Sequence, residues 1–313
     1  MVKTVVSTAL PIGERVVIQK NRITPEGGER PGMKRLCLCT GTHGDELEGQ
    51  YVCYLLADRI QKNLRCLKGV VDIYPSLNPL GIDTITRGIP MFDLDMNRIF
   101  PGNNVGPMAE FVAGRIMEDI KGADCCVDVH ASNVFLREVP QVRINEKTEQ
   151  TLVPLARRLN VDYIWVHANA TVLESTLAYS LNDAGVPTLV VEMGIGLRLT
   201  PAYCEQLVDG LIALMAELGL WDGEVPEVKK PVESRDGEVH YCNAEHPGIF
   251  VPAVEHGCQL VKGQHIGDVL SPLTGRVAES ILSPCDGWLF TLREYPVCYA
   301  GSLLARVLGG ADV

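Results

Sequence analysis

The chain has 313 residues, of which 46% are hydrophobic and 21% charged, and its formal net charge is -11. This length allows one large core or two domains. The acidic balance argues against nucleic acid as a partner, because phosphate recognition relies on Lys and Arg. No stretch approaches the ~20 apolar residues that span a bilayer, and the first residues lack the apolar region of a signal peptide. We therefore predict a cytoplasmic protein without a membrane partner, whose 11 cysteines are buried free thiols.

Short apolar runs alternate with helical patterns over the first part of the chain, residues 1–222. The apolar runs predict strands at 36–40, 70–74, 125–130, 163–166 and 188–192. The helical patterns predict helices at 46–63, 108–121, 146–159 and 201–220, and the residues 76–106 are interpreted as a long polar loop. Strands that alternate with helices favour an α/β fold, in which a mainly parallel or mixed sheet carries helices on both faces.

The pattern changes near residue 222. Residues 223–237 are rich in Glu, Lys and Pro without apolar periodicity, so we interpret them as a linker. Residues 238–313 contain recurrent glycines with short β-type runs between them, such as Gly287-Trp288-Leu289-Phe290. Short strands separated by turns predict a small all-β domain. Its glycine spacing resembles that of a barrel-sandwich hybrid, the fold of lipoyl and biotinyl carriers.

Two potential metal ligands follow the first predicted strand. His43 and Glu46 lie between this strand and the next helix, and sites in open α/β sheets form at the carboxyl ends of strands. A spacing of three residues lets both side chains converge on one ion if the turn is helical. Alone, such a pair is a weak signal, because a solvated loop whose Glu helps to cap the helix explains it equally well.

Further ionisable side chains end two later strands. His130 follows an apolar run, and Asp128 lies two residues earlier on the same strand face, where it could orient an imidazole. Glu192 follows the apolar run 188–191, and a carboxylate beside an apolar wall can have the raised pKa that suits a general base. A core histidine with an Asp partner and a salt-bridged Glu are the alternatives. Two imidazoles, one ligating carboxylate and one spare carboxylate are the minimum set for hydrolysis by a metal-activated water.

The polar loop contributes basic groups. It contains Arg87, and ten residues later the pair Asn97 and Arg98. Long loops in compact domains are often functional, and Arg binds carboxylates in a planar two-point geometry that Lys cannot reproduce. The alternative is a surface Arg paired with Asp93 or Asp95.

Six short motifs occur in the order that is typical of a known family: GTHGDE (41–46), NP (78–79), Arg87, NRIFPG (97–102), DVH (128–130) and VVEMG (190–194). Over roughly residues 35–220, and in its β tail, the chain therefore resembles the succinylglutamate desuccinylase and aspartoacylase family of the zinc carboxypeptidase superfamily. Many members have Asn at the position of Asp45 and Leu at that of Met96. Neither position is expected to contact the ion.

The resemblance implies that residues 1–222 form a zinc-dependent catalytic domain. It implies one zinc ion per chain, bound by His43, Glu46 and His130. The predicted reaction is hydrolysis of the amide bond of an N-acyl amino acid, of acetyl or succinyl type, by a metal-activated water. The products would be a free amino acid and a carboxylate.

The resemblance also implies roles for four residues around the ion. Glu192 would be the general base, and Arg87 would stabilise the oxyanion. Asn97 and Arg98 would hold the α-carboxylate of the substrate. The acyl group and the amino acid stay open, and a homo-oligomer is possible, since dimers and higher assemblies are common among such enzymes.

Several alternatives also stay open. A zinc carboxypeptidase acting on short peptides would use the same groups. A carrier protein would need a modified Lys at a hairpin tip, and Lys262 is the only Lys after residue 238. A sheet domain that binds a ligand without chemistry is the third possibility. Arg137 and Arg143 are candidates for selecting the substrate side chain. The remaining histidines are interpreted as surface or structural residues: His167, His240, His246, His256 and His265.

Overall fold

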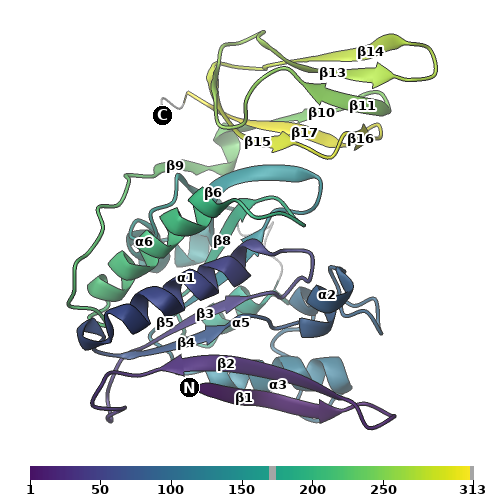
Figure 1. Ribbon diagram of the computed structural model, residues 1–313. Helices are drawn as coiled ribbons and strands as arrows, with labels where there is room; N and C mark the ends of the chain where they lie inside the picture. Colours follow the sequence, from purple (N-terminus) through teal and green to yellow (C-terminus); the bar gives the residue numbers. More distant parts are fainter. Residues whose placement is uncertain (169–173, 311–313) are drawn as a thin grey trace.

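The computed structural model describes residues 1–168 and 174–310. An α/β portion is followed by an all-β portion, which lies at one end of it (Figure 1). The predicted fold class is confirmed, because the α/β portion has a mixed sheet between helices and the C-terminal portion contains strands. Within the described ranges, none of the helices combines the length and the apolar character that a membrane span requires.

Four parallel strands form the middle of the main sheet, in the spatial order β4-β3-β5-β8. Their bounds are β3 (Arg35–Thr40), β4 (Val70–Tyr74), β5 (Cys125–Ala131) and β8 (Thr188–Gly194). Nearly all of their residues are buried. Cover on both faces explains why these strands are continuous apolar runs in the sequence rather than alternating ones. Because the strands are parallel, their carboxyl ends meet at one edge of the sheet.

Further strands flank this middle and make the sheet mixed. On one side an antiparallel hairpin pairs with β4; it consists of β1 (Val2–Ala9) and β2 (Arg15–Ile23). On the other side β6 runs antiparallel to β8, and β7 and β9 continue in parallel: β6 (Leu136–Asn145), β7 (Tyr163–His167) and β9 (Val232–Arg235). Strand β9 falls inside the predicted linker, 223–237, and the division of the chain into domains stays a prediction.

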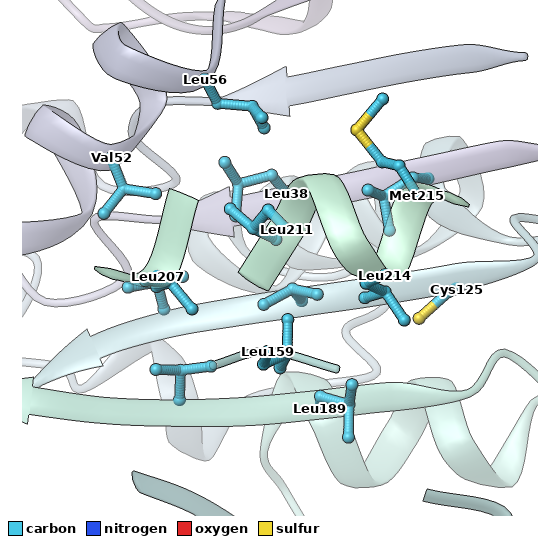
Figure 2. Close-up of a cluster of buried hydrophobic side chains, with 14 of the residues drawn as sticks. Leu38, Val52, Leu56, Cys125, Leu159, Leu189, Leu207, Leu211, Leu214 and Met215 are labelled. Atoms are coloured by element: carbon cyan, nitrogen blue, oxygen red, sulfur yellow. The ribbon is translucent and has the colours of Figure 1, made fainter. Parts of the chain in front are cut away.

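Helices cover both faces of the sheet. On one face, two helices share a large hydrophobic cluster with the strands (Figure 2): α1 (Glu48–Lys62) and α6 (Pro201–Glu217). A second cluster on the opposite face contains residues of α3 (Met108–Ile120) and α5 (Leu177–Asp183). The short helix α4 (Glu149–Ala156) contacts β6, β7 and β8.

The alternation of strand faces decides where the polar side chains lie. In β5, Val127 and Val129 belong to the cluster under α1 and α6, so Asp128 and His130 face the other side of the sheet. In β8 the same alternation directs Glu192 to that other side. His130 and Glu192 are also partners in the register of these two neighbouring strands. They therefore lie next to each other on one face.

The all-β portion is built from two sheets that share a core. One of them continues the main sheet and comprises β10 (Val239–Asn243), β15 (Gly287–Arg293) and β17 (Leu303–Gly309), with the short β12 (Gln259–Leu260) paired to β15. The other comprises β11 (Gly248–Pro252), β13 (His265–Ser271), β14 (Arg276–Leu282) and β16 (Val297–Cys298).

Strand β6 joins the two portions. Its first residues, Leu136–Glu138, pair with β15, and Gln141–Asn145 pair with β7. A cluster of buried aromatic side chains packs across the junction: Tyr163, Trp165, Trp288 and Phe290. The all-β portion is thus attached to the α/β portion both by strand pairing and by apolar burial.

Some elements were not predicted from the sequence. These are the N-terminal hairpin, β6, α5 and the short helices inside the loop 76–106, namely α2 (Pro79–Thr84) and a 3-10 turn (Met96–Arg98). Asn78 caps α2, because its side chain accepts a hydrogen bond from the Gly81 N–H at 3.0 Å, and Pro79 occupies the first turn. Asn-Pro is a helix start signal. The predicted polar loop, residues 76–106, therefore contains two short helical segments.

Candidate metal centre

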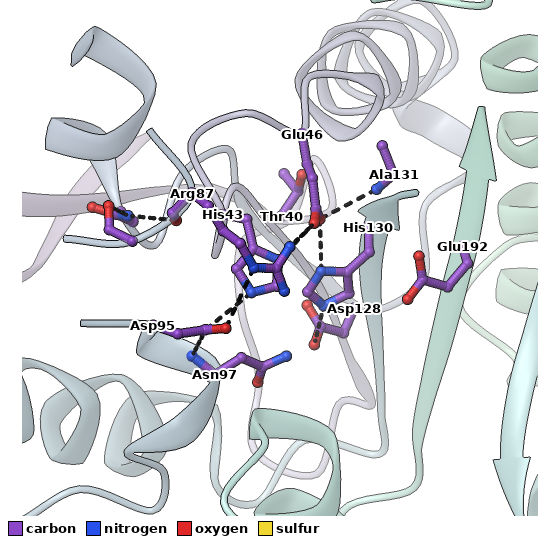
Figure 3. Close-up of polar contacts among 12 residues, drawn as sticks. Thr40, His43, Glu46, Arg87, Asp95, Asn97, Asp128, His130, Ala131 and Glu192 are labelled. Atoms are coloured by element: carbon purple, nitrogen blue, oxygen red, sulfur yellow. Dashed lines mark hydrogen bonds and ion pairs between the residues drawn. The ribbon is translucent and has the colours of Figure 1, made fainter. Parts of the chain in front are cut away.

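Three side chains converge at the carboxyl end of the parallel strands. His43 and Glu46 come from the connection between β3 and α1, and His130 comes from β5. The Glu46 carboxylate lies between the two rings, with Oε1 at 2.7 Å from His43 Nδ1 and Oε2 at 2.9 Å from His130 Nδ1 (Figure 3). All three side chains are buried, and one ligand atom of each lies within 4.8 Å of the others.

The far nitrogen of each ring meets a second carboxylate. His43 Nε2 lies 3.1 Å from Asp95 Oδ1, and His130 Nε2 lies 3.1 Å from Asp128 Oδ2. Carboxylates in this position are typical of metal-binding histidines, because they hold the proton on Nε2 and direct the Nδ1 lone pair at the ion. The spacing of Asp128 and His130 predicts this orienting role for Asp128. For Asp95, the neighbouring arginines indicate only a pairing with Arg.

The opposite charges in this cluster stabilise the ionised forms of the carboxylate and of the two rings. Burial opposes ionisation of Glu46, but the two imidazoles lower the pKa of its carboxyl to about 2. Burial would likewise lower the pKa of both rings. The hydrogen bonds and charges of Asp95 and Glu46 nevertheless raise the pKa of His43, and those of Asp128 and Glu46 raise the pKa of His130.

The donor set fits a divalent metal ion. A cation bound between the rings would replace the two Nδ1 protons and keep the Glu46 carboxylate paired with positive charge. Two His and one Glu are a frequent ligand set of catalytic sites, which use three protein ligands and keep a further coordination position open. The arrangement could therefore hold a metal ion and leave one side of it accessible from the cavity.

Close backbone packing brings Arg87 to this centre. Gly44 donates a hydrogen bond from its N–H to the Thr86 carbonyl at 3.1 Å. A Cβ atom at Gly44 would lie 2.0 Å from the Gly81 carbonyl carbon, so only glycine allows the turn to approach α2 this closely. As a result Arg87 Nη1 lies 3.0 Å from Glu46 Oε1.

Asn97 and Arg98 belong to the 3-10 turn Met96–Arg98, which Asp95 caps. The Leu177 backbone N–H donates to Asn97 Oδ1 at 2.9 Å, which fixes the orientation of this amide. Arg98 Nη1 donates to the Asn97 carbonyl at 2.8 Å, and the Arg98 side chain is 41% exposed. The guanidinium therefore has access to a ligand as well as to its own backbone partner.

Glu192 lies on β8, directly beside His130 of the neighbouring strand β5. Its carboxylate is directed towards His130 (Figure 3) and is 18% exposed. Burial raises the pKa of Glu192, while the charges of Arg143 and His130 oppose this rise. A carboxylate whose proton affinity is raised by its surroundings suits the acceptance and return of a proton.

All seven side chains to which the sequence assigns a metal, catalytic or α-carboxylate-binding role line one cavity of about 860 Å³. They are His43, Glu46, Arg87, Asn97, Arg98, His130 and Glu192. The structure brings them together from β5, β8 and the connections that follow β3 and β4. The roles assigned to the individual residues stay predictions.

The same cavity also contains residues that no sequence motif indicates, among them Glu138 of β6 and Arg306 of β17. His167, interpreted as surface or structural, lines it as well and lies with Nδ1 at 3.0 Å from Asp236 Oδ1. Of the two candidate selectors, Arg143 lines the cavity, whereas Arg137 pairs with Glu294 at 2.9 Å outside it. No local motif surrounds these residues, so spacing alone could not have identified them.

Comparison with known protein families gives one extensive match. The family model described as the succinylglutamate desuccinylase/aspartoacylase catalytic domain matches residues 32–218. A similar curated protein is the N-alpha-acetyl-L-2,4-diaminobutyric acid deacetylase of Halomonas elongata. It is 25% identical over 253 residues, which cover 77% of this chain and 72% of that protein.

Solved structures share the fold. The product-bound ectoine utilization protein EutE of Ruegeria pomeroyi superimposes with a TM-score of 0.81 at 20% identity, covering 97% of this chain and 92% of that one. A succinylglutamate desuccinylase from Silicibacter sp. TM1040 gives 0.82 at 21% identity, covering 96% and 92%. At these identities the likeness establishes the fold alone.

Asp128 and Asp95 offer a direct test of the metal centre. Because each carboxylate lies 3.1 Å from Nε2 of a proposed ligand ring, Asp128→Asn and Asp95→Asn are each expected to lower divalent metal affinity about 10–100-fold. The affinity can be measured with Zn²⁺ in competition with a chromophoric chelator. Asp58→Asn, on the exposed side of α1, is the matched control. Unchanged affinity in both variants would remove the orienting role.

Proposed function

Because the chain belongs to the succinylglutamate desuccinylase/aspartoacylase family, a family of N-acyl amino acid deacylases, we propose that it is a zinc-dependent amidohydrolase. It cleaves the amide bond of an N-acyl amino acid and releases the amino acid and a carboxylate. One observation carries this proposal. The buried His43, Glu46 and His130 converge within 4.8 Å in a cavity that also contains Glu192.

Zinc is the metal that we assign to this centre. Two imidazoles and one carboxylate are a preferred donor set for it, although other divalent ions bind similar ligands. When bound, zinc supplies a Lewis acid for the acyl carbonyl and lowers the pKa of a water molecule towards ~7. His43, Glu46 and His130 would hold one ion per chain, with Asp95 and Asp128 keeping both rings oriented.

Glu192 is the proposed general base. It takes a proton from the attacking water and delivers it to the nitrogen of the leaving amino acid. Its raised pKa supports both steps, since burial makes the carboxylate a better proton acceptor than an exposed Glu. Its position beside His130 in strand register keeps it next to the metal centre.

Three basic or amide side chains complete the proposal. Arg87, next to Glu46, stabilises the negative charge that develops on the acyl oxygen, the kind of preorganised contact that gives the largest catalytic term. Asn97 and Arg98 hold the α-carboxylate of the substrate. The fixed Asn97 amide and the accessible Arg98 guanidinium suit such a contact.

The cavity favours a small substrate over a peptide. Its volume of about 860 Å³ is of the size that takes one small molecule. Arg306 of the all-β portion is part of its wall, so this portion lies beside the reaction site and limits the space there. These observations support a deacylase in preference to the carboxypeptidase alternative.

The function is tested by a substrate screen on protein of known metal content. The panel contains N-acetyl and N-succinyl derivatives of Asp, Glu and diamino acids, together with a short peptide. We expect about one zinc per chain, hydrolysis of one or more N-acyl amino acids, and loss of activity on chelation that zinc restores. Peptide hydrolysis alone would favour the carboxypeptidase, and activity that resists chelation would contradict the proposal.

Glu192→Gln separates proton transfer from metal binding. The variant keeps the size of the side chain but cannot accept a proton, so kcat is expected to fall about 100–10,000-fold. The zinc content should stay at the level of the unmodified protein, because Glu192 is not a proposed ligand. Metal analysis and steady-state kinetics measure both quantities. Near-normal turnover would rule out Glu192 as the base.

Arg98→Ala tests the carboxylate contact. Loss of a charged hydrogen bond of about 1.5–3 kcal/mol corresponds to an increase in KM of roughly 10–100-fold. The metal content should not change. Arg115→Ala is the control, because Arg115 is exposed on α3 and pairs with Glu118 outside the cavity. A variant that loses zinc while its KM stays constant would show that Arg98 supports the metal centre instead.

A further inference from the structure

A buried carboxylate on β6 lies between two guanidinium groups in the cavity wall. The Glu138 side chain is only 1% exposed. Its Oε2 accepts a hydrogen bond from Arg143 Nη2 at 2.6 Å, and its Oε1 accepts one from Arg306 Nη1 at 2.6 Å. Gln141 donates to Oε2 as well, at 2.6 Å. Burial opposes ionisation, but Arg143 and Arg306 outweigh it and lower the pKa of Glu138.

Arg143 lies between two carboxylates. One end of its guanidinium binds Glu138, and its Nη1 lies 3.7 Å from Glu192 Oε1. This second distance is beyond a hydrogen bond but within the range of an ion pair. The guanidinium also lies 5.7 Å from the centre of the Trp165 ring, which supports it from the sheet. Arg143 is therefore the neighbour of Glu192 on the side away from the metal centre.

Arg306 enters this cluster from the all-β portion. It belongs to β17, and its guanidinium lies 5.7 Å from the Trp165 ring centre and 5.6 Å from that of Tyr241. With it, two guanidiniums face two carboxylates. Without it, one guanidinium would serve both Glu138 and Glu192. Arg143 Nη2 already contacts Glu138 Oε2, and loss of Arg306 would leave Oε1 without its guanidinium partner. Attraction is stronger at shorter separation and in buried surroundings, so the Nη1 end of Arg143 would then be drawn away from Glu192 towards Glu138.

We propose that Arg306 is a positioning residue for Glu192: by sharing the charge of Glu138, it leaves Arg143 available to hold the Glu192 carboxylate beside the metal centre. The proposal rests on the assignment of Glu192 as the base. It makes the all-β portion a part of the catalytic machinery. Docking of that portion does not require the ion pairs, because strand pairing and the aromatic cluster already attach it to β6 and β7.

Arg306→Met removes the charge but keeps an apolar stem that can pack near Trp165. Small displacements of catalytic groups can cost about 100-fold in rate, and we expect a fall in kcat of about this size. KM and zinc content should stay unchanged. Arg276→Met is the matched control, since Arg276 is an exposed arginine at the start of β14 in the same portion.

A charge-balanced double variant distinguishes positioning from a purely structural role. In Arg306→Met/Glu138→Gln, no buried carboxylate competes with Glu192 for Arg143, so most of kcat should return. If the double variant is as slow as Arg306→Met, or if Arg306→Met has normal kcat, the proposal is overturned. Should Arg306→Met fail to fold, the double variant carries the test: kcat close to that of the unmodified protein supports the proposal and a large loss overturns it.

Crystal structures of the same proteins give a readout that does not depend on activity. The separation of Arg143 Nη1 and Glu192 Oε1, 3.7 Å here, should lengthen in Arg306→Met and shorten again in the double variant. An unchanged separation overturns the proposal. If the unmodified protein hydrolyses no N-acyl amino acid, the proposed function fails, and these distances still decide whether Arg306 positions Glu192.

Discussion

The carboxylate of Glu46 is the interaction on which the rest of the site depends. It is buried, and it lies between His43 on its own loop and His130 on β5. A buried negative charge is costly unless it is paired. The contacts of Glu46 therefore make the loop after β3 and the end of β5 depend on each other for stability. The pairing partners of Glu46 are also the groups that a divalent cation would need. The same arrangement of side chains thus neutralises the buried carboxylate and provides the ligands for a cation.

Around that carboxylate, further charges alternate in sign. Asp95 and Asp128 lie behind the two rings, and Arg87 lies against Glu46. Each of these side chains pairs with a neighbour of opposite charge, and the two carboxylates keep the imidazole rings in one orientation. The backbone contributes through Gly44, whose lack of a side chain lets the ligand loop lie directly on the segment that carries Arg87. Precision at this centre comes from close packing as much as from electrostatic attraction.

The all-β portion extends the same principle away from the metal centre. Its attachment to β6 brings Arg306 next to Glu138, and Glu138 and Glu192 lie on either side of Arg143. A chain of alternating charges therefore runs from the C-terminal strands to the proposed base. If Arg306 positions Glu192 as proposed, the all-β portion contributes to the reaction through the one guanidinium that β17 places beside Glu138.

The residues that could be predicted from the sequence are those with a local signal. His43, Glu46, His130 and Glu192 lie at the end of an apolar run or in the loop that follows one, and such runs in an α/β pattern place their carboxyl ends at a common edge. The four parallel strands of the sheet middle, β7 and the longer helices were predictable for the same reason, because periodicity is a local property, whereas the N-terminal hairpin and β6 were not predicted. Only the tertiary structure decided the partners of these residues. Asp95 lies 52 positions from His43, and Arg306 lies 168 positions from Glu138. Contacts over such separations depend on strand order, register and close packing, which no local spacing encodes.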